Sequence, residues 1–273
     1  MSTKALQDIK MDTSLPFPDT FEGILQLVTQ LRSKDGCPWD QEQTLHTLTP
    51  LLLEECYELV EATENEQDSE RLEEIGDVLL HIAFQILISE ESDSFFRSDV
   101  FESTIKKYIR RHPHVFSDQT VDSIEDLKNN WEKMKREEKG EARQYEMDGI
   151  PSNLPALACA LKIQQRAARC GFDWDDSHEI RQKILEELSE FEAATNYDQQ
   201  EEEVGDLLFT VANMARHNGI DPEQALRNSN RKFVSRFTNM EKLSEQAGQK
   251  FSDLPLKSQD NLWQQVKLEE RRP

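Results

Sequence analysis

The chain has little of what interrupts regular structure, and it is short of positive charge. Its 273 residues include only 9 Gly, 10 Pro and 4 Cys, and no long run alternates apolar with polar residues. The few turn formers and the missing alternation disfavour sheets and favour helices. With 36% hydrophobic and 32% charged residues, the chain is poor in apolar side chains but above the disordered extreme. Its length suits one large or two ordinary domains, each able to bury a core.

The cysteines, the N-terminal residues and the longest apolar segment indicate the cellular compartment. The 4 cysteines form no CxxC pair. An even number permits disulfides, but a chain this long with ordinary helix patterns needs no covalent staples. We therefore expect reduced thiols and a cytoplasmic location. Residues 1–12 lack the apolar core of a secretory signal, and the best membrane candidate, Val78–Ile88, is too short to span a bilayer.

The charge balance limits the partners. With 32 Lys and Arg against 54 Asp and Glu, the formal net charge is −22. Broad nucleic-acid binding needs a basic footprint, so we expect neither a nucleic acid nor an anionic membrane surface as a partner. A small phosphorylated ligand is not excluded, because a metal ion and a few local cations can reverse the field inside one pocket.

A pattern of carboxylates occurs twice. Each copy reads E-E-x-x-E, then a gap, then E-x-G-D and large apolar residues. On helices, acids three residues apart share one face. The acids that would face each other are Glu55, Glu58, Glu74 and Asp77 in the first copy, and Glu187, Glu190, Glu203 and Asp206 in the second.

Four acids that converge between two helices repel one another unless a cation lies among them. A single E-E-x-x-E in so acidic a chain is most simply a solvated helix face. Two copies, each followed by E-x-G-D and an apolar run, favour a site for a hard metal ion, Mg²⁺ with Mn²⁺ as the alternative, and so favour phosphate chemistry. Gly76 and Gly205 lie between the acids, in helix interiors where glycine is costly. We predict that they permit close approach of the partner helix.

The repeat extends beyond the acids and predicts an all-α fold of two tandem helical-bundle domains. After an N-terminal tail at 1–18, the first domain covers 19–138, a polar linker with Gly and Pro covers 139–155, and the second domain covers 156–273. Asp122 is predicted to cap a helix through Trp131, and Asp221-Pro222 is a strong helix start.

Basic and aromatic residues follow each acid set in register. Lys107 and Arg111, four apart, match Lys232 and Arg236, and they are typical of phosphate ligands. Trp131 with Lys135 matches Trp263 with Lys267; the tryptophans suit either a core or a base-stacking pocket. In the second copy Lys183 precedes Glu187 by one turn, whereas Leu51 stands at that offset in the first. This difference predicts weaker phosphate binding in the first half.

His112-Pro113-His114 permits two interpretations. It is either a helix-terminating turn, which we favour, or a transition-metal site.

The duplicated acids with W-x-x-x-K after each basic helix resemble the MazG-type nucleoside triphosphate pyrophosphohydrolases, from about Phe21 to Glu270. The resemblance implies an all-α NTP pyrophosphatase fold, Mg²⁺ dependence, hydrolysis of nucleoside triphosphates to monophosphate and pyrophosphate, and a homodimer. By motif position it implies metal ligands at the eight acids, with the main activity in the second domain. It implies nucleotide binding by Lys183, Lys232, Arg236 and Trp263, and Glu186 or Glu187 would orient or deprotonate the attacking water.

Two other functions fit the same residues. A non-enzymatic nucleotide sensor would use the same Mg²⁺ site and report through the partner domain. A helical scaffold would leave the repeated acids unexplained, so it is the weakest of the three.

Overall fold

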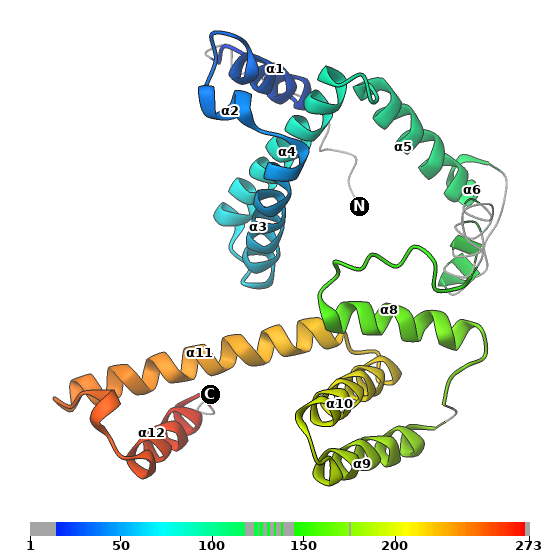
Figure 1. Ribbon diagram of the computed structural model, residues 1–273. Coiled ribbons are helices and arrows are strands. Elements are labelled where there is room, and N and C mark those ends of the chain that lie inside the picture. The colour runs from blue at the N-terminus through cyan, green and yellow to red at the C-terminus, as the bar shows by residue number, and fades with distance from the viewer. Residues whose placement is uncertain are drawn as a thin grey trace. The chain divides into compact units, whose positions relative to one another are not determined.

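The computed structural model describes residues 15–117, 145–174 and 176–270, and, between the first two ranges, residues 123, 124, 126, 127, 130, 131, 134 and 138. The described residues form helices and no strand, which confirms the all-α prediction (Figure 1). The chain divides into two compact units, Met1–Met134 and Lys135–Pro273. The predicted domain bounds and the linker at 139–155 stay a prediction.

The described part of unit 1 consists of α1 (Phe21–Arg32), α2 (Pro38–Glu42), α3 (Leu45–Glu64), α4 (Asp68–Glu91), α5 (Arg97–Arg111) and α6 (Pro113–Phe116). A capping box fixes the start of α3: the amide of Thr47 donates to the hydroxyl of Thr44, and the amide of Thr44 donates to the hydroxyl of Thr47. Residues 65–67 are all that joins α3 to α4, so the two helices run antiparallel.

The core of unit 1 forms where α1 crosses the α3–α4 pair. Leu25 and Val28 of α1 pack with Leu48 of α3 and with Ala83 and Phe84 of α4, and all five side chains are buried. These contacts hold the C-terminal half of α4 against α1 and α3. The acidic residues lie along the other half of the α3–α4 pair, beside the core and not within it.

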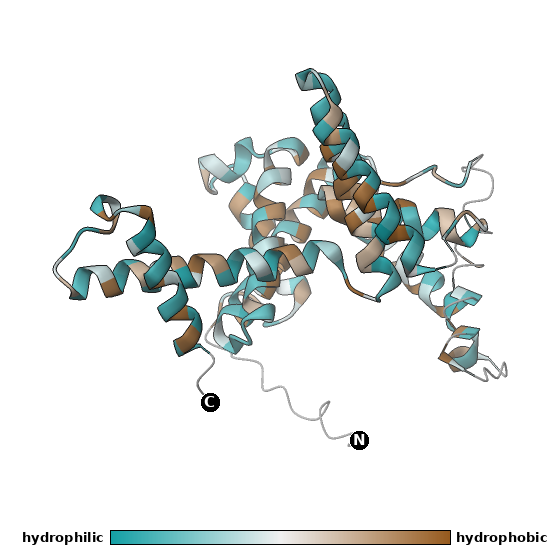
Figure 2. Ribbon diagram, turned by 90° about the horizontal axis from the view of Figure 1, so that it is seen from below, coloured by the Kyte–Doolittle hydropathy of each residue, from teal (hydrophilic) through white to brown (hydrophobic). Residues whose placement is uncertain are grey.

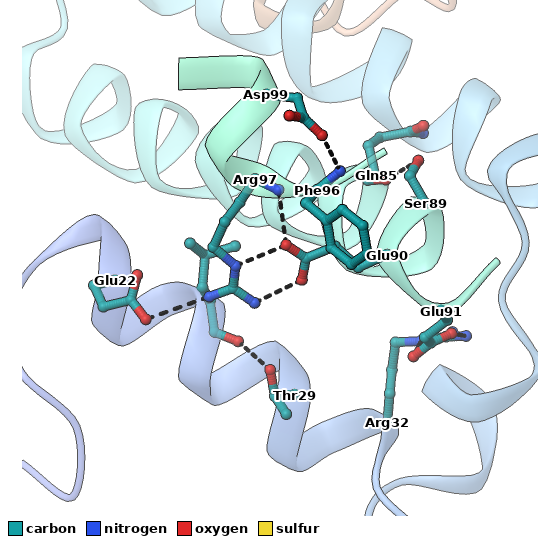
Figure 3. Close-up of polar contacts among 11 residues, drawn as sticks. Glu22, Thr29, Arg32, Gln85, Ser89, Glu90, Glu91, Phe96, Arg97 and Asp99 are labelled. Carbon is teal, nitrogen blue, oxygen red and sulfur yellow. Dashed lines mark hydrogen bonds and ion pairs between the residues drawn. The ribbon is translucent and has the colours of Figure 1, made fainter. Parts of the chain in front are cut away.

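An arginine ties α5 to the rest of unit 1. Arg97 donates to both carboxylate oxygens of Glu90 on α4, at 2.9 and 2.7 Å, and to Glu22 on α1 at 3.3 Å (Figure 3). Its backbone amide also donates to Glu90. The hydrogen bonds from Arg97 lower the pKa of Glu90 below its usual value. The turn between α4 and α5 is therefore fixed by charge-assisted hydrogen bonds, which sets the direction in which α5 leaves the core.

The described part of unit 2 consists of α8 (Ala156–Arg169), α9 (Ser177–Ala193), α10 (Tyr197–His217), α11 (Pro222–Gln246), the 3₁₀ turn η1 (Phe251–Asp253) and α12 (Leu256–Glu269). As predicted, α11 begins with Asp221 as N-cap, which accepts from the Gln224 amide, and with Pro222 at the first position. The cap predicted at Asp122 lies outside the described residues.

Unit 2 packs as two helix pairs that share α8. One pair is α9 with α10, and the other is α11 with α12; both α10 and α11 also contact α8 (Figure 1). Ile180, Ala212, Met240 and Val266 are buried at these contacts. The side-chain amide of Gln164 on α8 donates to the Phe209 carbonyl on α10 at 2.7 Å, so a buried polar contact also joins these helices.

Along the helices, hydrophobic residues are interspersed with hydrophilic ones (Figure 2). No helix in the described ranges combines the length and apolar character needed to cross a bilayer. All four cysteines are free thiols.

The core of unit 1 predicts which side chains are needed for its stability. Leu25→Ala is expected to lower the free energy of unfolding by about 2–5 kcal/mol, because it leaves a cavity in a fully buried position. Urea denaturation followed by circular dichroism measures it. Leu27→Ala, on the same helix but 36% exposed, is the matched control and should cost clearly less. Equal losses for the two variants would contradict this assignment of the core.

Candidate metal centre and anion site

Each unit brings three of the predicted acids together at one place. In unit 2, Glu187 and Glu190 on α9 and Glu203 on α10 each offer a carboxylate oxygen, and these oxygens lie within 4.8 Å of one another. In unit 1 the same holds for one oxygen each from Glu55 and Glu58 on α3 and from Glu74 on α4. The antiparallel helix pair and the three-residue spacing thus produce the same arrangement twice.

Asp77 and Asp206 lie one turn after Glu74 and Glu203 and are not members of these three-residue groups. Asp77 is nevertheless close enough to raise the pKa of Glu55 through its charge. Its equivalent, Asp206, is exposed on α10. A fourth ligand from either aspartate stays a prediction.

In unit 1, the surroundings of Glu55 and Glu74 disfavour the charged form of their carboxylates. Burial first, and the neighbouring carboxylates second, raise the pKa of Glu55 and of Glu74 above the usual value. One carboxylate oxygen of Glu74 is buried without a hydrogen-bond partner. The Nε2 atom of His81 approaches Glu55 at 3.8 Å, while burial lowers the pKa of the imidazole. A cation would satisfy the buried oxygen and offset the repulsion, so the residues fit a hard metal ion.

Unit 2 differs because a lysine neutralises part of its cluster. Lys183, one turn before Glu187 on α9, forms ion pairs of 2.7 Å with Glu186 and 2.8 Å with Glu187. These hydrogen bonds raise the pKa of Lys183. The Glu187 side chain is 3% exposed, so an unpaired charge there would be costly. On α10, burial and then the charges of Glu190 and Glu187 raise the pKa of Glu203.

The prediction for the two glycines is wrong. A Cβ atom at Gly76 or at Gly205 would meet no atom of another helix within 4 Å, and both residues are exposed. The partner helix therefore does not need glycine for its approach, because α3 and α9 pack against other faces of α4 and α10. The glycines instead leave the helix surface bare beside the acids.

The basic residues of unit 2 form a second group on the other helix pair. Arg236 on α11 lies over the ring of Trp263 on α12, with 5.4 Å from its central carbon to the ring centroid. Its Nη2 and Nε atoms donate to Glu270 at 2.7 and 2.9 Å. The pKa of Glu270 is lowered first by these hydrogen bonds and further by the charges of Lys232 and Lys267. Three predicted cations thus act on one carboxylate. We call the group of Lys232, Arg236, Lys267 and Glu270 the anion site.

Aromatic side chains border the anion site. Phe233 packs against Trp263 with ring centroids 5.4 Å apart, and Phe237 stacks on Phe233. The tryptophan is half-buried, so it is neither a full core residue nor a free stacking platform.

Unit 1 repeats this group with different aromatics. Arg111 lies over Trp131 at 5.3 Å, and Lys107 lies over the ring of Tyr108 at 5.4 Å. The His112 ring is 4.9 Å from that of Trp131. His112 caps the end of α5, and its Nδ1 atom is 2.7 Å from the Tyr108 carbonyl, which agrees with the interpretation as a helix-terminating turn. Lys135 lies outside the described residues.

Each of the two groups of unit 2 contains ion pairs of its own. Lys183 pairs with acids of its own helix, and Arg236 pairs with Glu270. Sequence reasoning missed Glu270 and His81. The signal for Glu270 is its spacing: it follows Trp263 by seven residues, as Glu138 follows Trp131, and two helical turns return to the same face. His81 has no such signal, because Thr210 occupies the equivalent position.

Comparison with known proteins identifies related sequences for both halves. Residues 43–116 match the family model described as the MazG nucleotide pyrophosphohydrolase domain, and residues 163–233 match the one described as phosphoribosyl-ATP pyrophosphohydrolase.

Whole-chain relatives agree with these matches. The nucleoside triphosphate pyrophosphohydrolase/pyrophosphatase MazG of Thermotoga maritima is 42% identical over 247 residues, covering 90% of this chain and 95% of the relative. The nucleoside triphosphate pyrophosphohydrolase of Escherichia coli K12 is 37% identical over 254 residues, covering 90% and 97%. The uncharacterized protein YabN of Bacillus subtilis is 40% identical over 256 residues, covering 92% of this chain and 52% of its own length.

The raised pKa values of Glu55, Glu74 and Glu203 predict how pH and Mg²⁺ act on stability. A carboxyl group whose folded-state pKa exceeds 4.5 stabilises the fold at low pH and loses this contribution as pH rises through the raised value. Mg²⁺ binds only deprotonated carboxylates, so its stabilising effect should grow over the same interval. Melting temperatures with and without millimolar Mg²⁺, from mildly acidic to neutral pH, measure this. Glu203→Gln should reduce the Mg²⁺ effect, unlike the neighbouring exposed Glu202→Gln; an effect of Mg²⁺ that shrinks toward neutral pH contradicts the assignment.

Proposed function

The chain belongs to the MazG family of nucleoside triphosphate pyrophosphohydrolases, and from this membership we propose that it hydrolyses nucleoside triphosphates to monophosphate and pyrophosphate with Mg²⁺, mainly in unit 2. The observation that carries the proposal is the acid cluster of unit 2 with Lys183 paired to it. Clustered carboxylates supply the oxygen ligands that a hard cation needs. The adjacent lysine would attract the phosphate oxygens of the substrate to that cation. A cytoplasmic location goes with this substrate and with the free thiols.

The residues of unit 2 divide the work among them. Glu187, Glu190 and Glu203, with Asp206 as the fourth predicted ligand, would hold the Mg²⁺ ion. When bound, a divalent cation supplies neutralisation of phosphate charge and a more acidic water. Lys183 is paired to two acids and half-exposed, so it can exchange a carboxylate for a phosphate oxygen as the substrate arrives.

Hydrolysis requires in-line attack of water at the α-phosphorus and departure of pyrophosphate. Glu186 is 54% exposed and stands outside the three-residue cluster, so we assign it to orient the water and accept its proton; Glu187 is the alternative. The bond from the α-phosphorus to the bridging oxygen breaks, and the electron pair leaves with pyrophosphate. Lys232 and Arg236 would hold that leaving group, with Lys267 close by, and Trp263 would contact the nucleotide.

Unit 1 has the acids but not the lysine. Leu51 stands where Lys183 stands in unit 2, and His81 is the basic neighbour of Glu55. Without a lysine at that position, unit 1 attracts a triphosphate less strongly. We therefore assign it a Mg²⁺ site formed by Glu55, Glu58, Glu74 and Asp77 that binds more than it cleaves, with Lys107, Arg111 and Lys135 as its phosphate contacts.

The homodimer implied by the resemblance has two supports. Apolar side chains on α10 are exposed, among them Leu208 at 51% and Met214 at 43%. Faces of this kind usually mark an interface, since large apolar patches are rare on monomers. In addition, the acids and the anion site lie on different helix pairs of unit 2, so a second copy could bring cations to each acid cluster.

The activity is tested by product analysis. Glu190→Gln is expected to lower Mg²⁺-dependent turnover by about 100-fold or more, because even second-sphere partners of metal ligands are worth 10–100-fold. The matched change in unit 1, Glu58→Gln, should leave the larger part of the turnover. Separation of the products after incubation with each NTP measures both.

Each other outcome of this experiment has a defined meaning. Full turnover by Glu190→Gln contradicts the metal site of unit 2. Diphosphate with phosphate means that the wrong bond was assigned. Unchanged NTP with measurable binding supports the nucleotide sensor instead.

The dimer is tested by light scattering coupled to size-exclusion chromatography. The wild-type chain is expected to elute with twice its mass of 31.8 kDa, and Leu208→Asp should shift it toward one chain, since a buried unpaired charge is costly at an interface. Leu256→Asp, at a position 74% exposed on α12, is the control and should stay dimeric. A wild-type monomer at micromolar concentration contradicts the dimer.

A further inference from the structure

We propose that Glu270 is an internal counter-anion that occupies the pyrophosphate-binding edge of Arg236 and competes with pyrophosphate for it. This inference rests on the proposed function, because it takes Arg236 as a ligand of the leaving group. Glu270 would then set how tightly the product is held.

The geometry of the contact is that of an arginine with a bound oxyanion. Nε of Arg236 lies 3.1 and 2.9 Å from the two carboxylate oxygens of Glu270, and Nη2 lies 2.7 Å from one of them. The Nε–Nη2 edge is one of the edges by which a guanidinium binds a phosphate in two-point fashion. Trp263 lies against the face of the same guanidinium. A phosphate that approaches this edge must displace the carboxylate.

The surroundings of Glu270 favour its charged form. The hydrogen bonds from Arg236 and the charges of Lys232 and Lys267 all lower its pKa. The same three cations were predicted from the sequence to bind the nucleotide. One carboxylate therefore already balances part of the charge that a pyrophosphate would balance.

The position of Glu270 makes exchange feasible. It is the C-cap residue of α12, and its backbone amide bonds to the carbonyls of Val266 and Leu268 in the last turn. Helix ends open at little free-energy cost compared with helix centres. The Glu270 side chain is 36% exposed, whereas that of Arg236 is 17% exposed. Glu270 can therefore swing away while Arg236 stays packed on Trp263.

The sequence repeats the spacing in unit 1. Glu138 follows Trp131 by seven residues, as Glu270 follows Trp263. Two helical turns place each glutamate on the face of its tryptophan. The spacing is therefore not peculiar to the end of α12.

Pyrophosphate binding to the full chain, measured by calorimetry without divalent cations, tests the proposal. Glu270→Gln keeps the size of the side chain and an acceptor oxygen but removes the charge that competes. It is expected to tighten pyrophosphate binding by about 2- to 5-fold, the range expected for loss of one partly exposed ion pair. The matched control is Glu269→Gln, which changes the net charge equally; Glu269 accepts a hydrogen bond from Gln265 and does not contact Arg236.

The other variants separate this inference from the proposed function. If Glu270→Gln binds pyrophosphate more weakly than the wild type, or no more tightly than Glu269→Gln, Glu270 does not compete and the inference fails. Arg236→Gln should weaken pyrophosphate binding, and Glu270→Gln should bring no gain in that background. Wild-type affinity in Arg236→Gln would instead overturn the phosphate role of Arg236, on which the inference depends.

Discussion

The repulsion among carboxylates that two packed helices hold together governs the chemistry of each unit. The hairpins α3–α4 and α9–α10 bring the acids close together, because each helix pair is joined by a short loop and its two helices pack against each other. The cost is visible in the raised pKa values of Glu55, Glu74 and Glu203 and in the partnerless oxygen of Glu74. A hard divalent cation relieves the repulsion among carboxylate oxygens that lie this close together, so each cluster is suited to bind one.

The two units relieve this repulsion differently, and the difference separates their roles. In unit 2, Lys183 forms ion pairs with Glu187 and Glu186, so the buried Glu187 has a cationic partner that can also meet a phosphate. In unit 1, Leu51 offers no charge, and His81 is a long 3.8 Å from Glu55 with its pKa lowered by burial. At the anion site the situation is reversed: cations gather there, and Glu270 neutralises them. The acid cluster of unit 2 thus contains one cation, Lys183, and the anion site contains one anion, Glu270. We propose that the metal ion and the substrate would displace these two side chains from their present partners.

What the sequence predicts well is what depends on local spacing. The helices, the cap at Asp221-Pro222 and the convergence of Glu187, Glu190 and Glu203 follow from periodicity within one or two helices. The role given to Gly76 and Gly205 was wrong, because which face of a helix its neighbour covers depends on packing across the unit. Glu270 was missed for a similar reason: its partner Arg236 lies 34 residues away, on another helix. Which helices of unit 2 pack together as pairs was also beyond local patterns.

The roles given to both helix pairs of unit 2 depend on a divalent-cation site formed by the acids of α9 and α10. Anomalous diffraction from crystals soaked in Mn²⁺ tests it most directly, since Mn²⁺ takes the same oxygen ligands as Mg²⁺ and scatters strongly enough to be located. We expect an anomalous peak bound by carboxylate oxygens of Glu187, Glu190 and Glu203. Anomalous peaks elsewhere on the chain, with none between α9 and α10, would contradict it.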